Sequence, residues 1–99
     1  MKKLLIASMA TALLFSASAN AMDAPAKQAT CVGCHGADGN SVVPNFPKLA
    51  GQHAAYLEKQ LKDFRGGFRK DATMAPFAAG LSDTDIKELA AWFSSQPTK

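Results

Sequence analysis

The sequence has 99 residues, of which 11 are Lys or Arg, 8 are Asp or Glu and only 2 are Cys. A chain of this length forms one small domain, and small domains often need a metal, a disulfide or a cofactor to complete their core. The formal net charge is +3, and it falls to +1 without Lys2 and Lys3, which lie in a predicted leader. This nearly balanced charge gives no support to nucleic-acid binding.

Residues 1–21 have the pattern of a secretory signal peptide. A lysine pair precedes an apolar run over residues 4–15, and small residues follow up to Ala21. A membrane anchor is the alternative, but the run is shorter than the roughly 20 residues that a membrane-spanning helix needs. We expect cleavage after Ala21, with Ala19 as the second choice, which leaves one domain over residues 22–99. The expected location is the periplasm, an oxidising compartment in which idle free thiols are uncommon.

The first part of the mature chain predicts a short helix and a long loop. Residues 23–34 are expected to be helical, with Pro25 tolerated in the first turn. Residues 36–51 hold three glycines and two prolines and are expected to form an ordered loop.

The second part predicts two longer amphipathic helices separated by a loop over residues 68–81. The first of these helices has apolar residues at helical spacing before a glycine pair that ends it: Ala54, Leu57, Leu61 and Phe64, then Gly66 and Gly67. The last helix begins with Ser82 as N-cap and closes before Pro97, with acidic residues in its first turn. The expected fold class is all-α, with about three helices and two long loops. Such long loops in so small a domain indicate that they wrap something.

The segment Cys31-Val32-Gly33-Cys34-His35 holds both cysteines of the chain. A tetrahedral zinc site needs four convergent ligands, and only His53 and carboxylates could complete one here. A redox Cys-x-x-Cys pair is expected beside a βαβ pattern, and a plain disulfide would close a tiny loop and stabilise little. On one helical turn the two thiols and the imidazole share a face. They therefore best suit a haem, with two thioether bonds to its edge and the imidazole on its iron.

The sequence resembles the class I cytochromes c, and it is similar to one half of the tandem di-haem bacterial cytochromes. The resemblance covers essentially the whole mature chain and rests on "CVGCHG", "FPKLAG", a methionine in the second loop and "LSDTDIKELAAWF". It implies the class I cytochrome c fold around one covalently bound haem c. Cys31 and Cys34 would then be the covalent anchors, and His35 the proximal ligand of the iron.

The resemblance assigns two more residues. Met74, in "KDATMAPF", would be the sixth ligand of the iron, in preference to Met22 at the start of the mature chain. The carbonyl of Pro47 would accept a hydrogen bond from His35 Nδ1 and set the tautomer of that ring.

Other residues are weaker candidates for contact with the cofactor. His53 competes with His35 for the iron, although a histidine at a helix start is more often a surface or capping residue. Tyr56, Arg65 and Arg69 could hold the haem propionates, or could be plain surface residues.

The predicted function is that of a periplasmic one-electron carrier with His/Met-ligated haem iron, not an enzyme. Expected partners are redox protein donors and acceptors, such as a membrane cytochrome complex, a terminal oxidase or a reductase, with no small-molecule substrate. The alternatives are a haem enzyme or gas-binding sensor with a labile sixth ligand and, third, a non-haem zinc or disulfide protein. Residues 59–70 carry five basic side chains, which form either a docking patch for an acidic partner or a solvated helix face. We prefer the solvated face, because charge runs on helices are commonly solvated.

Overall fold

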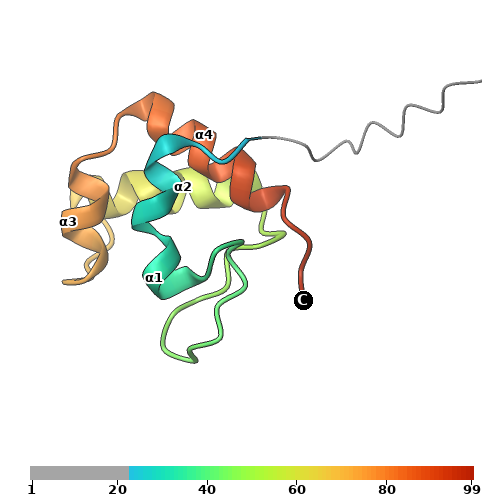
Figure 1. The fold of residues 1–99 in the computed structure, drawn as a ribbon. Coiled ribbons are helices and arrows are strands. Elements are labelled where there is room, and N and C mark those ends of the chain that lie inside the picture. Colours follow the sequence, from blue (N-terminus) through green and yellow to red (C-terminus); the bar gives the residue numbers. More distant parts are fainter. Residues whose placement is uncertain (1–22) are drawn as a thin grey trace, which may run out of the picture.

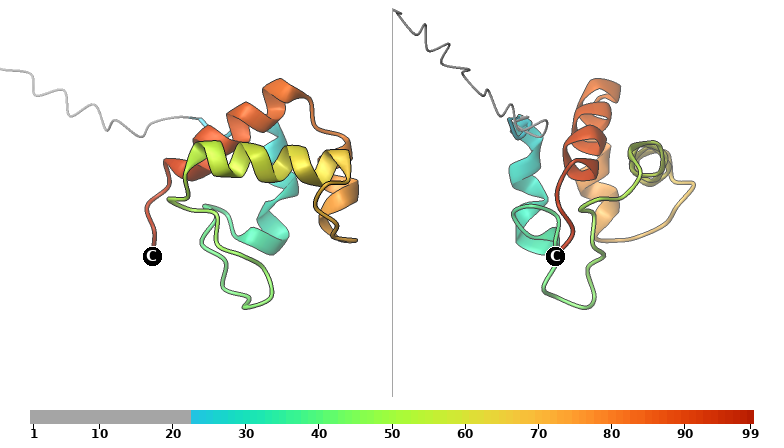
Figure 2. Two further views of the ribbon diagram at one scale, coloured as in Figure 1. Left: turned by 180° about the vertical axis from the view of Figure 1, so that it is seen from behind. Right: turned by 90° about the vertical axis from the view of Figure 1, so that its right-hand side faces the viewer.

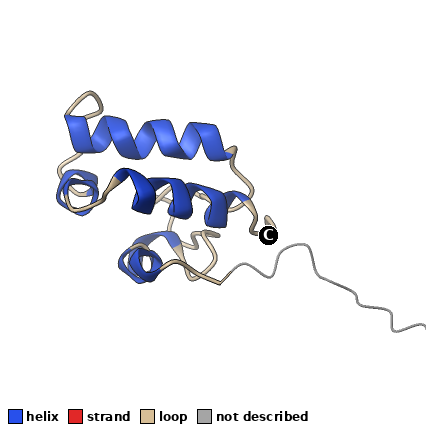
Figure 3. Cartoon of the chain, turned by 90° about the horizontal axis from the view of Figure 1, so that it is seen from above, coloured by secondary structure: helices blue, strands red, loops and turns tan. Residues whose placement is uncertain are grey.

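The computed structural model describes residues 23–99, so the predicted leader lies outside the described residues. Five helical elements follow one another, and no strand occurs within this part of the chain (Figure 3). They are η1, a 3-10 helix at Ala26–Thr30, and the α-helices α1 (Val32–His35), α2 (Ala54–Gly66), α3 (Met74–Ala79) and α4 (Asp83–Ser94). The prediction of an all-α fold is confirmed.

Helices α2 and α4 lie side by side and run in opposite directions, and η1 packs against α4 on the side away from α2 (Figures 1 and 2). Their facing sides form the core, which consists of Leu57, Leu89, Ala90, Trp92 and Phe93. Cys31, between η1 and α1, and Leu49 of the following loop pack against this core. The site is therefore built on the edge of a small core.

No helix of residues 23–99 has the length and apolar character to cross a membrane.

The first predicted helix is divided into two pieces, which corrects the expectation of one helix over residues 23–34. The chain is a 3-10 helix up to Thr30 and becomes α-helical only from Val32. Thr30 donates its hydroxyl hydrogen bond to the Lys27 carbonyl at 2.7 Å, and Cys31 N donates to the Gln28 carbonyl at 2.9 Å. These bonds occupy the carbonyls of Lys27 and Gln28. In a continuous α-helix, each carbonyl would instead accept from the backbone N–H four residues further along.

The segment over residues 68–81, for which the sequence predicts a loop, contains helix α3. Pro76 lies in the first turn of this helix, where its missing N–H costs nothing. Asp71 caps the turn through its side chain, a signal in "DATMAP" that sequence reasoning overlooked. The second loop is thus shorter than predicted, and Met74 lies on a helix.

The ends of α2 and α4 agree with the sequence-based expectations. Gly67 ends α2 in the left-handed conformation, with φ of 81°. Ser82 and Asp85 form a reciprocal capping box at the start of α4. Both helix boundaries follow from short local patterns.

Candidate functional site

His35 is the last residue of α1, and only 5% of its surface is exposed. Its Nδ1 lies 2.7 Å from the carbonyl oxygen of Pro47. Because a carbonyl can only accept a hydrogen bond, Nδ1 carries a proton, and the tautomer of the neutral ring is the one whose lone pair is on Nε2. The hydrogen bond that the resemblance implied is present, and it leaves Nε2 in the form that binds a metal.

The loop over residues 36–51 brings Pro47 back to His35. The carbonyl of Gly39 accepts hydrogen bonds from Leu49 N at 2.8 Å and Ala50 N at 3.1 Å, which closes the loop at its base. Gly39 has a φ of 82°, and a Cβ there would lie 2.7 Å from the Phe93 ring. The loop is therefore fixed against the C-terminal part of α4, and it carries Pro47 with it.

Phe46 precedes Pro47 and completes the surroundings of the imidazole. Its ring lies edge-on to that of His35, with 6.4 Å between the centroids. Sequence reasoning did not single out Phe46, since its position beside the histidine depends on how the loop folds back.

Cys31 and Cys34 are free thiols, both half-buried. Burial is the main cause that raises the pKa of the Cys31 thiol, a hydrogen bond with Thr30 lowers it, and the nearby Cys34 raises it. Cys31 therefore stays a neutral thiol at neutral pH. No group of three His, Cys, Asp or Glu side chains suited to a metal ion occurs among residues 23–99.

Met74 is the first residue of α3 and is half-buried. Its backbone N–H donates to Asp71 Oδ1 at 2.9 Å. Helix α3 packs against α2, at the end of α2 where the chain leaves that helix (Figures 1 and 2).

The weaker candidates are placed as follows. His53 is exposed and occupies the N-cap position of α2 without a side-chain capping bond. Tyr56 is about half exposed, whereas Met22 lies outside the described residues. Arg65 reaches the Leu81 carbonyl at 3.1 Å and Asp83 at 2.6 Å, so its guanidinium is already engaged within the protein.

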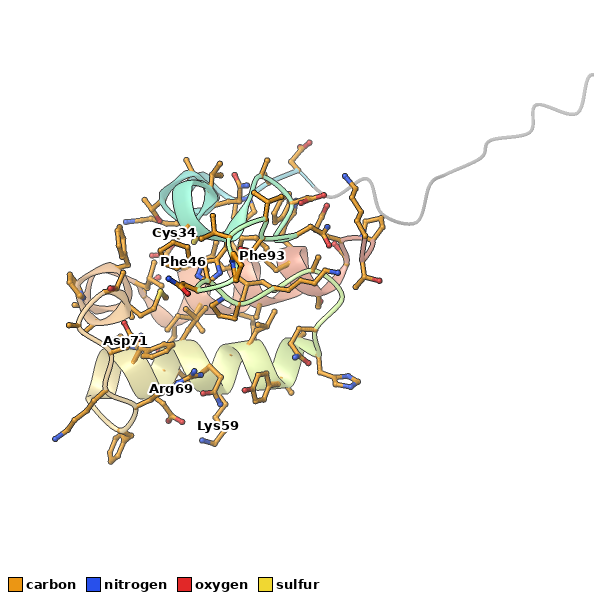
Figure 4. All side chains as sticks on the ribbon, turned by 90° about the horizontal axis from the view of Figure 1, so that it is seen from below. Cys34, Phe46, Lys59, Arg69, Asp71 and Phe93 are labelled. Carbon is orange, nitrogen blue, oxygen red and sulfur yellow. The ribbon has the colours of Figure 1, made fainter. Side chains whose placement is uncertain are left out.

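The basic run over residues 59–70 is extensively paired within the chain. Lys59 pairs with Asp63, and Lys62 pairs with Glu58 at 3.0 Å. Arg69 lies 4.5 Å over the Phe64 ring. Lys59 points away from the rest of the molecule on the outer side of α2 (Figure 4). These contacts favour a solvated helix face over a docking patch, because partnered charges contribute little long-range attraction.

The donor set fits a covalently attached haem. Two free thiols stand beside a buried imidazole whose Nδ1 is hydrogen-bonded and whose Nε2 is available. A thioether side chain, Met74, is carried by a separate helix. Imidazole and thioether are a pair that holds haem iron, and two cysteines at this spacing attach the haem ring.

Comparison with known proteins agrees with this chemistry. The family model of cytochrome c matches residues 23–97. Cytochrome c4 of Pseudomonas aeruginosa is 48% identical over 99 residues, and the match covers 97% of this chain and 49% of that protein. Cytochrome c-554(548) of Halomonas halodenitrificans is 52% identical over 73 residues, which cover 71% of this chain and 88% of that protein.

A solved structure has the same arrangement of helices. The crystal structure of reduced recombinant cytochrome c4 from Pseudomonas stutzeri matches with a TM-score of 0.71 and 47% identity, over 80% of this chain and 48% of that chain. The chain thus spans about half the length of the cytochrome c4 proteins that it matches.

Proposed function

The chain belongs to the cytochrome c family, and on this premise we propose that it is a periplasmic mono-haem electron carrier with His35 and Met74 as the axial ligands of the iron. The observation that carries the proposal is buried His35, held through Nδ1 by the Pro47 carbonyl and flanked by two free thiols. When bound, haem c supplies a one-electron change between ferric and ferrous iron.

Cys31 and Cys34 anchor the cofactor through thioether bonds, and His35 presents Nε2 to the iron. Pro47 acts on this ligand through the opposite ring nitrogen, because its carbonyl orients the ring and raises the basicity of Nε2. Phe46 packs at the ring edge and helps to keep water from it.

Met74 supplies the sixth ligand from α3. A thioether favours reduced iron over oxidised iron, so this pair of ligands raises the reduction potential relative to harder ligands. With both axial positions filled by the protein, the chain transfers electrons and has no substrate position at the metal. A haem enzyme or gas-binding sensor would need that sixth position to open.

Redox proteins are the proposed partners, as donors and acceptors that meet an exposed edge of the cofactor. The pairing within the basic run leaves little charge for long-range steering, so encounters depend on short-range contact and are brief. Residues 1–21 act as the export signal in this proposal, and residues 22–99 form the cytochrome domain.

The test is the spectrum of the purified holoprotein and of two methionine variants. A pyridine haemochrome with two saturated thioether linkages is expected for the unaltered protein. Met74→Ala should lose the ferric methionine–iron charge-transfer band and bind CO rapidly in the ferrous state, because it lacks the sixth ligand. Met22→Ala is the matched control and should retain the band.

Two results would contradict the proposal. A protein purified without a covalently attached haem would remove its basis. Survival of the charge-transfer band in Met74→Ala would show that another residue is the ligand.

A further inference from the structure

We propose that Asp71 is a positioning residue for Met74, because its carboxylate fixes the first turn of the helix that presents the thioether. The inference rests on the proposed ligation of iron by Met74, and it concerns a residue three positions before that ligand.

Asp71 accepts the hydrogen bonds of the backbone N–H groups at the start of α3. Its Oδ1 accepts from Thr73 N at 2.8 Å and from Met74 N at 2.9 Å. Its main-chain carbonyl accepts from Ala75 N at 2.9 Å, and Pro76 has no N–H to satisfy. One residue therefore supplies all the acceptors that a helix start requires.

Helix α3 depends on this cap more than a longer helix would. It has six residues, and helices this short do not form on their own because too few hydrogen bonds offset the cost of nucleation. Thr73 occupies the N-cap position but forms no capping bond with its own side chain. The start of the helix, where Met74 lies, is therefore held by Asp71.

The other end of α3 is fixed differently. Ala78 is fully buried, and its carbonyl accepts from Leu81 N at 3.1 Å. Packing against α2 thus holds the C-terminal turn, whereas Met74 is only half-buried. Loss of the cap should loosen the turn that carries Met74 while the rest of α3 stays in place.

The experiment compares the holoprotein with Asp71→Ala and Asp71→Asn. Alanine removes the side-chain acceptor, and the lost cap should raise the fraction of iron without methionine by roughly tenfold. The charge-transfer band should weaken, and CO should bind ferrous Asp71→Ala correspondingly faster. Asparagine keeps an oxygen at the same distance along the side chain, so Asp71→Asn should retain the band and the slow CO binding.

Asp85→Ala is the matched control, since Asp85 is a half-buried acid that caps α4 by accepting from Ser82 N at 3.0 Å. It should lower the melting temperature without changing the band or the CO rate. Asp71→Glu offers a second variant that keeps the charge but moves the acceptor, and it should weaken the band.

The outcomes separate the inference from the proposed function. If Met74→Ala loses the band and Asp71→Ala keeps both the band and slow CO binding, Asp71 does not position the ligand although the ligation stands. Equal losses in Asp71→Asn and Asp71→Ala, or a full band in Asp71→Glu, would also overturn the inference. If Met74→Ala keeps the band, the proposed ligation fails and the inference fails with it.

Discussion

His35 and Met74 both lie on helices of a few residues, yet the chain supports the two in different ways. His35 is buried and bonded to Pro47, twelve positions further along, in a loop whose base is closed by Gly39. Met74 is half-buried, and its backbone is held by Asp71, a near neighbour in the sequence. Long-range contacts thus fix His35, whereas local contacts hold the first turn of α3, which carries Met74.

This difference indicates which of the two residues should be displaced first when the protein is destabilised. A ligand held by contacts from several distant segments moves only when the fold itself opens. A ligand held by a local cap can detach while the core stays intact. On the proposed ligation, we therefore expect Met74 to leave the iron before His35 as the protein is destabilised.

The largest expected effect is that of a glycine substitution on the histidine side, and it is compared with a glycine substitution on the methionine side. Gly39→Ala adds a Cβ that would lie 2.7 Å from the Phe93 ring and 2.9 Å from Ala50 N, at a φ of 82°. Overpacking and left-handed strain together should lower the free energy of unfolding by about 3–5 kcal/mol. The measurement is denaturant unfolding of the holoproteins.

Gly67→Ala is the control on the methionine side. Its φ is 81°, but a Cβ there meets nothing within 4 Å. Only the conformational strain remains, and the loss should be about 1 kcal/mol. Equal losses at the two glycines would remove the distinction between the two sides.

A smaller effect is expected from Arg65→Lys. Arg65 bridges the Leu81 carbonyl and Asp83, and so ties the end of α2 to the chain that leaves α3. Lysine has one nitrogen and cannot make both contacts with the forked geometry of arginine. The melting temperature of the holoprotein should fall by a few degrees.

Arg69→Lys tests whether that loss is specific to the bridge. Arg69 is exposed and contacts the Phe64 ring and Gln60. Its replacement should lower the melting temperature less than Arg65→Lys does. A larger loss of melting temperature in Arg69→Lys would show that Arg69, and not Arg65, holds this segment in place.

The smallest effect is a loss of stability in acid. A hydrogen bond from Lys99 is the main cause of the lowered pKa of Asp38, and one from Arg65 is the main cause for Asp83. Each folded pKa lies below the ordinary value of 3.8, so the stabilisation is complete above that value and is lost as the pH falls through the folded pKa.

The free energy of unfolding should therefore be nearly constant from neutral pH down to about pH 5 and should decline below about pH 4. Asp38→Asn and Asp83→Asn should each flatten part of the decline, and denaturant titrations at several pH values would measure it. Asp83 is exposed and Asp38 is only partly buried at the surface, so each contribution is small. An unchanged acid profile in the double variant would assign the decline to other groups.

Much of the fold and part of the site could be predicted from the sequence. The class I cytochrome c fold that the resemblance implied agrees with the solved structure of cytochrome c4, and haem c is the cofactor of the family. The roles of Cys31, Cys34, His35, Met74 and Pro47 toward that cofactor stay predictions, although the hydrogen bond between His35 and Pro47 is present.

The sequence by itself determined the features that depend on near neighbours. Cys31, Cys34 and His35 share a helical turn through their spacing alone. Ser82 and Gly67 mark helix ends because capping involves residues only a few positions apart. Such patterns are legible in a sequence because their physical causes are local.

Tertiary structure decided the features that depend on where distant segments meet. The packing of α3 on α2 stabilises six residues that are too few to form a helix alone, so the sequence suggested a loop. Arg65 binds Leu81 and Asp83, sixteen and eighteen positions away, although the sequence left it as a candidate partner of the haem propionates or a plain surface residue. Phe46 reaches His35 because Gly39 folds the loop back. Each of these outcomes depends on the packing of the whole domain, because contacts between distant residues form only when the chain closes around its core.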